Sequence, residues 1–136
     1  MQNEKLMCFA YAKRIIYGEN MENLIQTKSF DFAVRIINLY KHLTTGKKEF
    51  VLSKQLLRSG TSIGANVTEA ESGQSRADFY AKMSIALKEA NETYYWLRLM
   101  FITEYLSENQ FKSMEIDIKE LISILVSICK TTQNNN

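Results

Sequence analysis

Residues 56–73, LLRSGTSIGANVTEAESG, hold three of the five glycines of a 136-residue chain whose other segments have the periodicity of long helices. Gly60 and Gly64 stand in a GxxxG spacing, and small hydroxyl residues surround them. Three interpretations are open for this stretch: a phosphate-binding loop, a flexible linker, or a helix kept narrow for close packing. The choice among them decides both the fold and the search for a functional site.

A narrow helix accounts for the stretch best. Its apolar and small residues recur at steps of three or four, on one face of a helix: Leu52, Leu56, Gly60, Ile63, Val67 and Ala70. A phosphate loop needs a preceding strand and a lysine after its second glycine, but Gly64 is followed by Ala65 and Asn66. Each internal glycine costs a helix about 1 kcal/mol relative to alanine, so tight packing must compensate. We predict that Gly60, Ser62 and Gly64 admit a close neighbour, from the same chain or from another subunit.

Three further helices are predicted around this one. The first begins near Ser29 and ends at Gly46, with an inward stripe of Phe30, Ala33, Ile36, Ile37, Tyr40 and Leu43 that Phe32 and Leu39 widen. A capping box of Ser75 and Asp78 opens a long helix, whose inward residues are Phe79, Met83, Ala86, Ala90, Tyr94, Leu97 and Phe101. Ser107 and Gln110 cap the last helix, which turns inward Phe111, Met114, Ile118, Leu121, Ile122, Leu125 and Ile128.

Four amphipathic helices with short connections predict an all-α fold, an antiparallel up-down-up-down four-helix bundle. The bundle domain spans residues 21–136 and ends in a polar, frayed tail, TTQNNN. Residues 1–20 form an N-terminal extension. They are either a segment upstream of an original start at Met21 or a short helix packed on the bundle.

The composition narrows the class of protein. Proline is absent, and 46% of the residues are hydrophobic, which suits long helices around a core. No apolar window is long enough to cross a membrane. Cys8 and Cys129 stand alone, which argues against a disulfide framework or a structural zinc site and predicts free thiols in the cytoplasm.

The net charge of +2 is unevenly distributed along the chain. Residues 1–68 carry 10 basic and 5 acidic residues, whereas residues 69–136 carry 7 and 10. A basic half can bind nucleic acid, but two halves of opposite sign can equally complement each other within the fold.

The residues give little support for a catalytic site. His42 is the only histidine, and Asn66, Glu69 and Glu71 have no nucleophile placed to pair with them. The Glu-x-x-His motif of a carboxylate-bridged metal bundle is missing from the sequence. We therefore predict a protein that is not an enzyme and that uses no metal or cofactor.

Residues that would face each other on neighbouring helices give more specific predictions. If the second and third helices run antiparallel across a turn at residues 72–74, Arg58 lies near Glu89 and Glu92, and Asn66 lies near Tyr80. We predict that Arg58 pairs with one of these glutamates and fixes the register. Tyr94, Tyr95 and Trp96 cannot all face one core, so Tyr95 or Trp96 points either to a subunit contact or to another part of the bundle.

The segments Gln55–Leu56, Arg58, SGTSIGANVTEA (59–70), Ser75, Asp78–Phe79 and KEANETYYWL (88–97) together resemble the four helix bundle protein family, also called the 23S rRNA intervening-sequence protein or S23 family. The resemblance covers residues 28–130. It implies a bacterial cytosolic protein with an antiparallel bundle. The family is also similar to the accessory proteins of diversity-generating retroelements, which are basic, form rings of five subunits, and bind nucleic acid and a reverse transcriptase.

From this resemblance we expect a homo-oligomer, a pentamer by analogy, that binds RNA or DNA or a ribonucleoprotein partner. The candidate nucleic-acid ligands are Lys47, Lys48, Lys54, Arg58 and Arg76. The candidate structural or interface residues are Gly60, Ser62, Gly64, Asn66, Glu69, Glu89, Glu92, Tyr95 and Trp96. A charge of +2 is a weak basis for binding a polyanion, so a protein-interaction scaffold without nucleic acid is the alternative.

Overall fold

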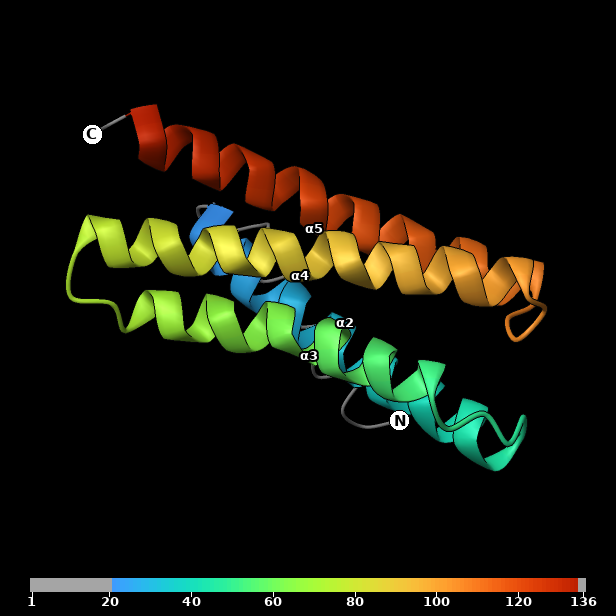
Figure 1. Cartoon of the computed structure of the whole chain (residues 1–136). Coiled ribbons are helices and arrows are strands. Elements are labelled where there is room, and N and C mark those ends of the chain that lie inside the picture. Colours follow the sequence, from blue (N-terminus) through green and yellow to red (C-terminus); the bar gives the residue numbers. More distant parts are fainter. Residues whose placement is uncertain (1–20, 135–136) are drawn as a thin grey trace.

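The computed structural model describes residues 21–134, and this part of the chain folds into four helices without a strand. In chain order they are α2 (Met21–Thr45), α3 (Leu52–Glu71), α4 (Arg76–Ile102) and α5 (Glu108–Asn134) (Figure 1). The fold class is the predicted one. Helix α2 begins well before Ser29, and α5 continues through the first part of the tail that was predicted to fray. The predicted extension, residues 1–20, lies outside the described residues.

Consecutive helices run antiparallel, as their contacts show. Along α3, Ser59 contacts Thr93 of α4, and Glu69, ten residues later, contacts the earlier Lys82. Side chains between α4 and α5 pair in the same descending order. Helix α2 packs on α3 and α5, and α3 packs on α4, so the chain goes up, down, up and down around one core (Figure 1).

The core repeats every seven residues. Its positions alternate in steps of three and four: Ser53, Leu56, Gly60, Ile63, Val67 and Ala70 in α3; Met83, Ala86, Ala90, Thr93, Leu97 and Met100 in α4; Phe111, Met114, Ile118, Leu121, Leu125 and Ile128 in α5. This spacing keeps one seam of each helix toward its neighbours, as in coiled coils. Three residues of the predicted α4 stripe, Phe79, Tyr94 and Phe101, are only half-buried at the core edge, while Thr93 and Met100 lie inside.

Helix α2 departs most from its predicted stripe. Its buried positions are Ile25, Ser29, Phe32, Ile36, Leu39 and Leu43. Phe30 and Ile37 were predicted to face inward and are instead 64% and 40% exposed. Both follow a true core position, Ser29 or Ile36, by one residue and so point about 100° away from it. The apolar residues of α2 cover more than one face, so the predicted stripe was too wide: it held the core residues Phe32, Ile36, Leu39 and Leu43 together with the exposed Phe30 and Ile37.

The narrow-helix prediction is confirmed for residues 56–71, whereas 72–73 lie in the turn that follows, and the close neighbour belongs to the same chain. A Cβ on Gly60 would lie 2.7 Å from the Cγ1 of Ile36, which is fully buried. A Cβ on Gly64 would lie 3.2 Å from the backbone oxygen of Ser29. The two glycines therefore let α2 approach α3 within the bundle.

Polar side chains mark where helices begin. The Ser75 hydroxyl accepts the Asp78 amide at 3.1 Å, as predicted. At α5, the Ser107 hydroxyl accepts the Gln110 amide at 3.2 Å, and the Gln110 side-chain oxygen accepts the Ser107 amide at 2.9 Å, which completes the second predicted capping box. These caps fix the two connections that follow α3 and α4.

Candidate nucleic-acid interface

Three of the five predicted nucleic-acid ligands gather at one end of the bundle. Lys47 and Lys48 lie in the connection between α2 and α3, and Lys54 lies in the first turn of α3. Lys41, in the last turns of α2, adds a fourth ammonium group at this end (Figure 1). All four side chains are exposed, and within residues 21–134 none of them forms an ion pair. We call these four residues the lysine end.

The carboxylate that follows Lys48 in the sequence, Glu49, is turned away from the lysine end. Glu49 is only 8% exposed, and its oxygens accept the amides of Val51 at 3.1 Å, Leu52 at 2.8 Å and Ser53 at 2.7 Å. Burial by itself raises the pKa of Glu49, but these hydrogen bonds outweigh it, and the net effect lowers the pKa. Glu49 thus satisfies the free amides at the start of α3, and its oxygens are not available to the lysines.

The connection itself is held in a strained backbone shape. Lys48 has a φ of 55°, in the left-handed region that side chains other than glycine seldom adopt. On either side of it, the Gly46 amide donates to the His42 oxygen at 2.8 Å and the Glu49 amide donates to the Leu43 oxygen at 3.0 Å. These bonds return the chain tightly over the end of α2, and Lys47 and Lys48 are exposed on this turn.

The two predicted arginines do not join the lysine end. Arg76 begins α4 and therefore lies at the opposite end of the bundle, beside the turn that follows α3. Arg58 bonds to two acidic side chains of α4, Glu89 at 3.2 Å and Glu92. The predicted pairing is present, but it lies on the surface, because the Arg58 side chain is 49% exposed. Arg58 is thus engaged by two carboxylates and has little capacity left for phosphate.

The other predicted interface residues divide into internal and outward groups. Ser62 and Asn66 bond to the backbone of their own helix, the hydroxyl to the Arg58 oxygen at 2.6 Å and the amide to the Ser62 oxygen at 2.8 Å. Glu69 pairs with Lys82 at 2.6 Å. Asn66 thus has its hydrogen bond within α3, and the predicted proximity to Tyr80 has no hydrogen bond to support it.

The aromatic pair of α4 points outward in part. Tyr95 is 53% exposed and meets Trp96 edge to face, with ring centroids 5.1 Å apart. Trp96 is half-buried and donates its ring N–H to Glu92 at 3.3 Å. Tyr94 turns to the other side of α4, where its hydroxyl bonds to Glu115 at 2.5 Å and its pKa is raised by that bond and by burial. Tyr95 is therefore the outward member of the three.

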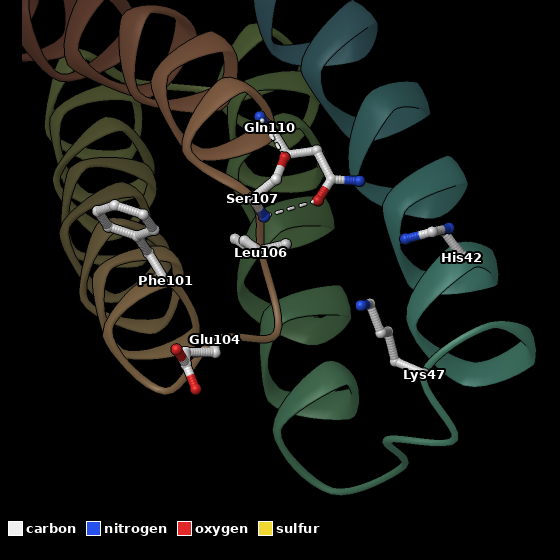
Figure 2. A pocket seen from close by; sticks show the side chains of 7 residues that line it. All are labelled: His42, Lys47, Phe101, Glu104, Leu106, Ser107 and Gln110. Carbon is white, nitrogen blue, oxygen red and sulfur yellow. Dashed lines mark hydrogen bonds between the residues drawn. The ribbon is translucent and has the colours of Figure 1, made fainter.

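A depression of about 520 Å³ lies beside the lysine end and was not predicted. Residues of both connections at this end line it: His42, Lys47, Phe101, Glu104, Leu106, Ser107 and Gln110 (Figure 2). Figure 2 shows the Lys47 ammonium pointing across the depression toward the start of α5. The sequence gives no signal for this site, because its lining comes from segments about 60 residues apart that only the fold brings together.

Neither a metal site nor a membrane span is found in the described chain. Among residues 21–134, no three His, Cys, Asp or Glu side chains are grouped as metal ligands would be. None of the four helices is long and apolar enough for a membrane span. Cys129 is a free, partly buried thiol, whose pKa is raised by burial, and its sulfur lies 3.9 Å from the Ser84 hydroxyl.

A family model described as 23S rRNA-intervening sequence protein matches residues 21–127, which is nearly the whole bundle. The chain belongs to this family. The sequence resemblance is thereby confirmed, and the match begins where the described structure begins.

A solved structure supports the same assignment. The chain is 58% identical to a protein of unknown function from the S23 ribosomal protein family of Bacteroides thetaiotaomicron VPI-5482. The alignment covers 82% of this chain and 99% of that chain, with a TM-score of 0.80. No curated protein matches. The intervening-sequence family is thus shown by sequence and by fold, and its molecular role is open.

Proposed function

We propose that this intervening-sequence protein is a non-enzymatic, cytoplasmic homo-oligomer, pentameric by the resemblance described above, that binds RNA or a ribonucleoprotein partner. The observation that supports RNA binding is the lysine end. Four ammonium groups lie there without ion pairs in the described chain, and the carboxylate of the adjoining Glu49 is turned inward. Phosphate contacts need cations that are free to release their counterions.

The local charge matters more than the net charge of +2. Most other cations of the bundle are engaged: Lys28 with Glu120, Arg35 with Asp117, Arg58 with Glu89 and Glu92, Lys82 with Glu69, Lys112 with Glu108, and Lys119 with Glu115. In an oligomer, each copy would add its own lysine end, so that a modest charge is repeated across one assembly. Exposed Phe50, next to these lysines, offers a ring on which an unpaired base can stack.

The test is the salt dependence of a mobility shift with labelled single-stranded RNA. We expect binding at about 50 mM salt, and an affinity that falls linearly on a log–log plot as salt rises. Lys47→Glu with Lys48→Glu should weaken binding and reduce that slope by about 0.7 per lost phosphate contact. Lys130→Glu is the control, because Lys130 is exposed on α5 at the opposite end of the bundle.

Two results would count against RNA binding at this end. One is the lack of any shift at low salt while the protein is oligomeric, which would favour the scaffold without nucleic acid. The other is a Lys130→Glu variant that loses as much affinity as the double variant, since that would mean a diffuse response to net charge. If the double variant and the Lys130→Glu variant bind RNA equally well, the lysine end has no special role in binding.

A further inference from the structure

The depression beside the lysine end has a wall of nitrogen donors. Lys47, His42 and Gln110 line it, from the α2–α3 connection, the last turn of α2 and the start of α5. Figure 2 shows the Lys47 ammonium, the His42 ring and the Gln110 amide nitrogen turned toward the same part of the depression. Within residues 21–134, none of these three side-chain nitrogen groups takes part in a hydrogen bond or an ion pair. Three separate segments thus place unused donors around one space.

The cap of α5 sets the orientation of Gln110. Its side-chain oxygen accepts the Ser107 amide at 2.9 Å, and its backbone amide donates to the Ser107 hydroxyl at 3.2 Å. Because the oxygen is held at the cap, the NH2 group points the other way, toward α2 (Figure 2). A capping box accepts either glutamine or glutamate at this position. Glutamine therefore gives the depression a donor that the cap itself does not need.

The acidic groups around the depression leave these donors unused. Among the lining residues, Glu104 is the one carboxylate, and Figure 2 shows it directed away from Lys47. Glu108, at the start of α5, pairs with Lys112 at 2.9 Å. Glu49 is occupied by the amides of α3. The depression therefore presents donors and positive charge without an anion of the described chain to satisfy them.

We propose that the depression binds a phosphate monoester group, with Lys47, His42 and Gln110 as its ligands. A phosphate monoester has three terminal oxygens and can accept from all three donors, whereas a carboxylate has two oxygens. It also carries about 1.5 to 2 negative charges at pH 7, against one for each phosphodiester of an RNA backbone. A histidine ring donates from one nitrogen even when it is neutral. The volume of about 520 Å³ lies within the range of about 300–1,000 Å³ that is typical of ligand sites.

The phosphate monoester can belong to the 5′ end of an RNA or to a free nucleotide. The first source rests on the proposed function and deepens it, because the depression would then hold the RNA end beside the lysine end. The second source needs neither RNA nor an oligomer. In both cases Phe101, half-buried with its ring stacked on Phe111 at 4.5 Å, gives the attached nucleoside an apolar surface on the α4 side of the depression.

Calorimetric titration with adenosine 5′-monophosphate at about 50 mM salt tests the site itself. We expect the wild type to bind this nucleotide and not adenosine, which lacks the phosphate. Gln110→Glu and Lys47→Gln should each weaken binding about tenfold or more, as for the loss of a hydrogen bond to a charged group. Gln110→Glu should keep the wild-type stability in urea, because glutamate completes the same cap.

Asn109→Asp is the matched control for Gln110→Glu. It is the same change from amide to carboxylate one residue earlier, at an exposed position that does not line the depression. We expect it to alter the affinity by no more than about twofold, because a solvated charge is screened by salt. Equal losses in Asn109→Asp and Gln110→Glu would mean a general response to charge and would overturn the site.

Mobility shifts with one single-stranded RNA, made with a 5′-phosphate or a 5′-hydroxyl, identify the source. A preference of the wild type for the 5′-phosphate that Gln110→Glu abolishes supports the RNA end. Nucleotide binding without such a preference supports the free nucleotide, and it does so even if no RNA binds and the proposed function fails. If both RNAs bind equally and the nucleotide does not bind up to millimolar concentration, the depression is no phosphate site while RNA binding stands. If neither RNA nor nucleotide binds, both proposals are wrong.

Discussion

Gly60 is the residue on which the packing of α2 against α3 depends. In Gly60→Ala, the new methyl group would meet the side chain of Ile36, which is β-branched, fully buried and unable to move aside cheaply. The gain in helix propensity, about 1 kcal/mol, is smaller than the cost of overpacking, about 1–3 kcal/mol. We expect a net loss in the free energy of unfolding of up to about 2 kcal/mol, measured by urea denaturation.

Ser62→Ala is the matched control for this change, because Ser62 is in the same helix, two residues on, and bonds only to the backbone of α3. It should alter the free energy of unfolding by no more than about 0.5 kcal/mol. A Gly60→Ala protein more stable than the wild type would show that α2 does not approach as closely as described.

Glu49 gives the bundle a pH-dependent element. Because its pKa is lowered in the folded state, its contribution to stability is present above its ordinary value of 4.5 and is lost as the pH falls through the folded pKa. Glu49→Gln should lower the free energy of unfolding by about 1–2 kcal/mol at neutral pH. The difference from the wild type should shrink in acid, and denaturation curves at several pH values measure it. A difference that stays constant from neutral to acid pH would contradict the charged cap.

At the scale of elements, the contact of α3 with α4 has a buried and an exposed layer. The buried layer includes the Ser59 and Thr93 hydroxyls, 3.0 Å apart, and the exposed layer is Arg58 with Glu89 and Glu92. Exposed pairs contribute about 0.2–1 kcal/mol and are screened by salt. We expect Arg58→Met to lower the free energy of unfolding by at most about 1 kcal/mol, and by less at high salt. The salt dependence of urea denaturation measures this.

If Arg58→Met lowered the free energy of unfolding by more than this, and equally at low and high salt, Arg58 would have the register-fixing role predicted from the sequence. With the ion pair on the surface, the seven-residue repeat of the core is the better account of the register, since a shift by one residue would bring polar positions into the core.

The sequence predicted some elements more fully than others. Both serine caps were found, because a capping box is local in sequence. The core face of α2 was predicted too widely, since Phe30 and Phe32 are both apolar and only the neighbouring helices decide which is covered. At the candidate site, Lys47, Lys48 and Lys54 were found as local basic residues. The sequence could not show that Arg58 is engaged by α4, that Arg76 lies at the other end, or that Glu49 turns inward.

At the scale of the whole molecule, the core is complete within one chain, so any contact between copies would form through surface residues. The signature glycines are used within one chain, so a contact between copies would need other residues on the surface, where Phe30 and Tyr95 are among the large exposed side chains. These side chains are separate from the lysine end.

The measurement that tests the proposed homo-oligomer most directly is the mass of the purified wild-type protein by size-exclusion chromatography with light scattering. The account predicts a single species several times heavier than the 15.8 kDa chain, and five times heavier if the resemblance holds for the subunit number. A mass of one chain over the full range of protein concentration would contradict it.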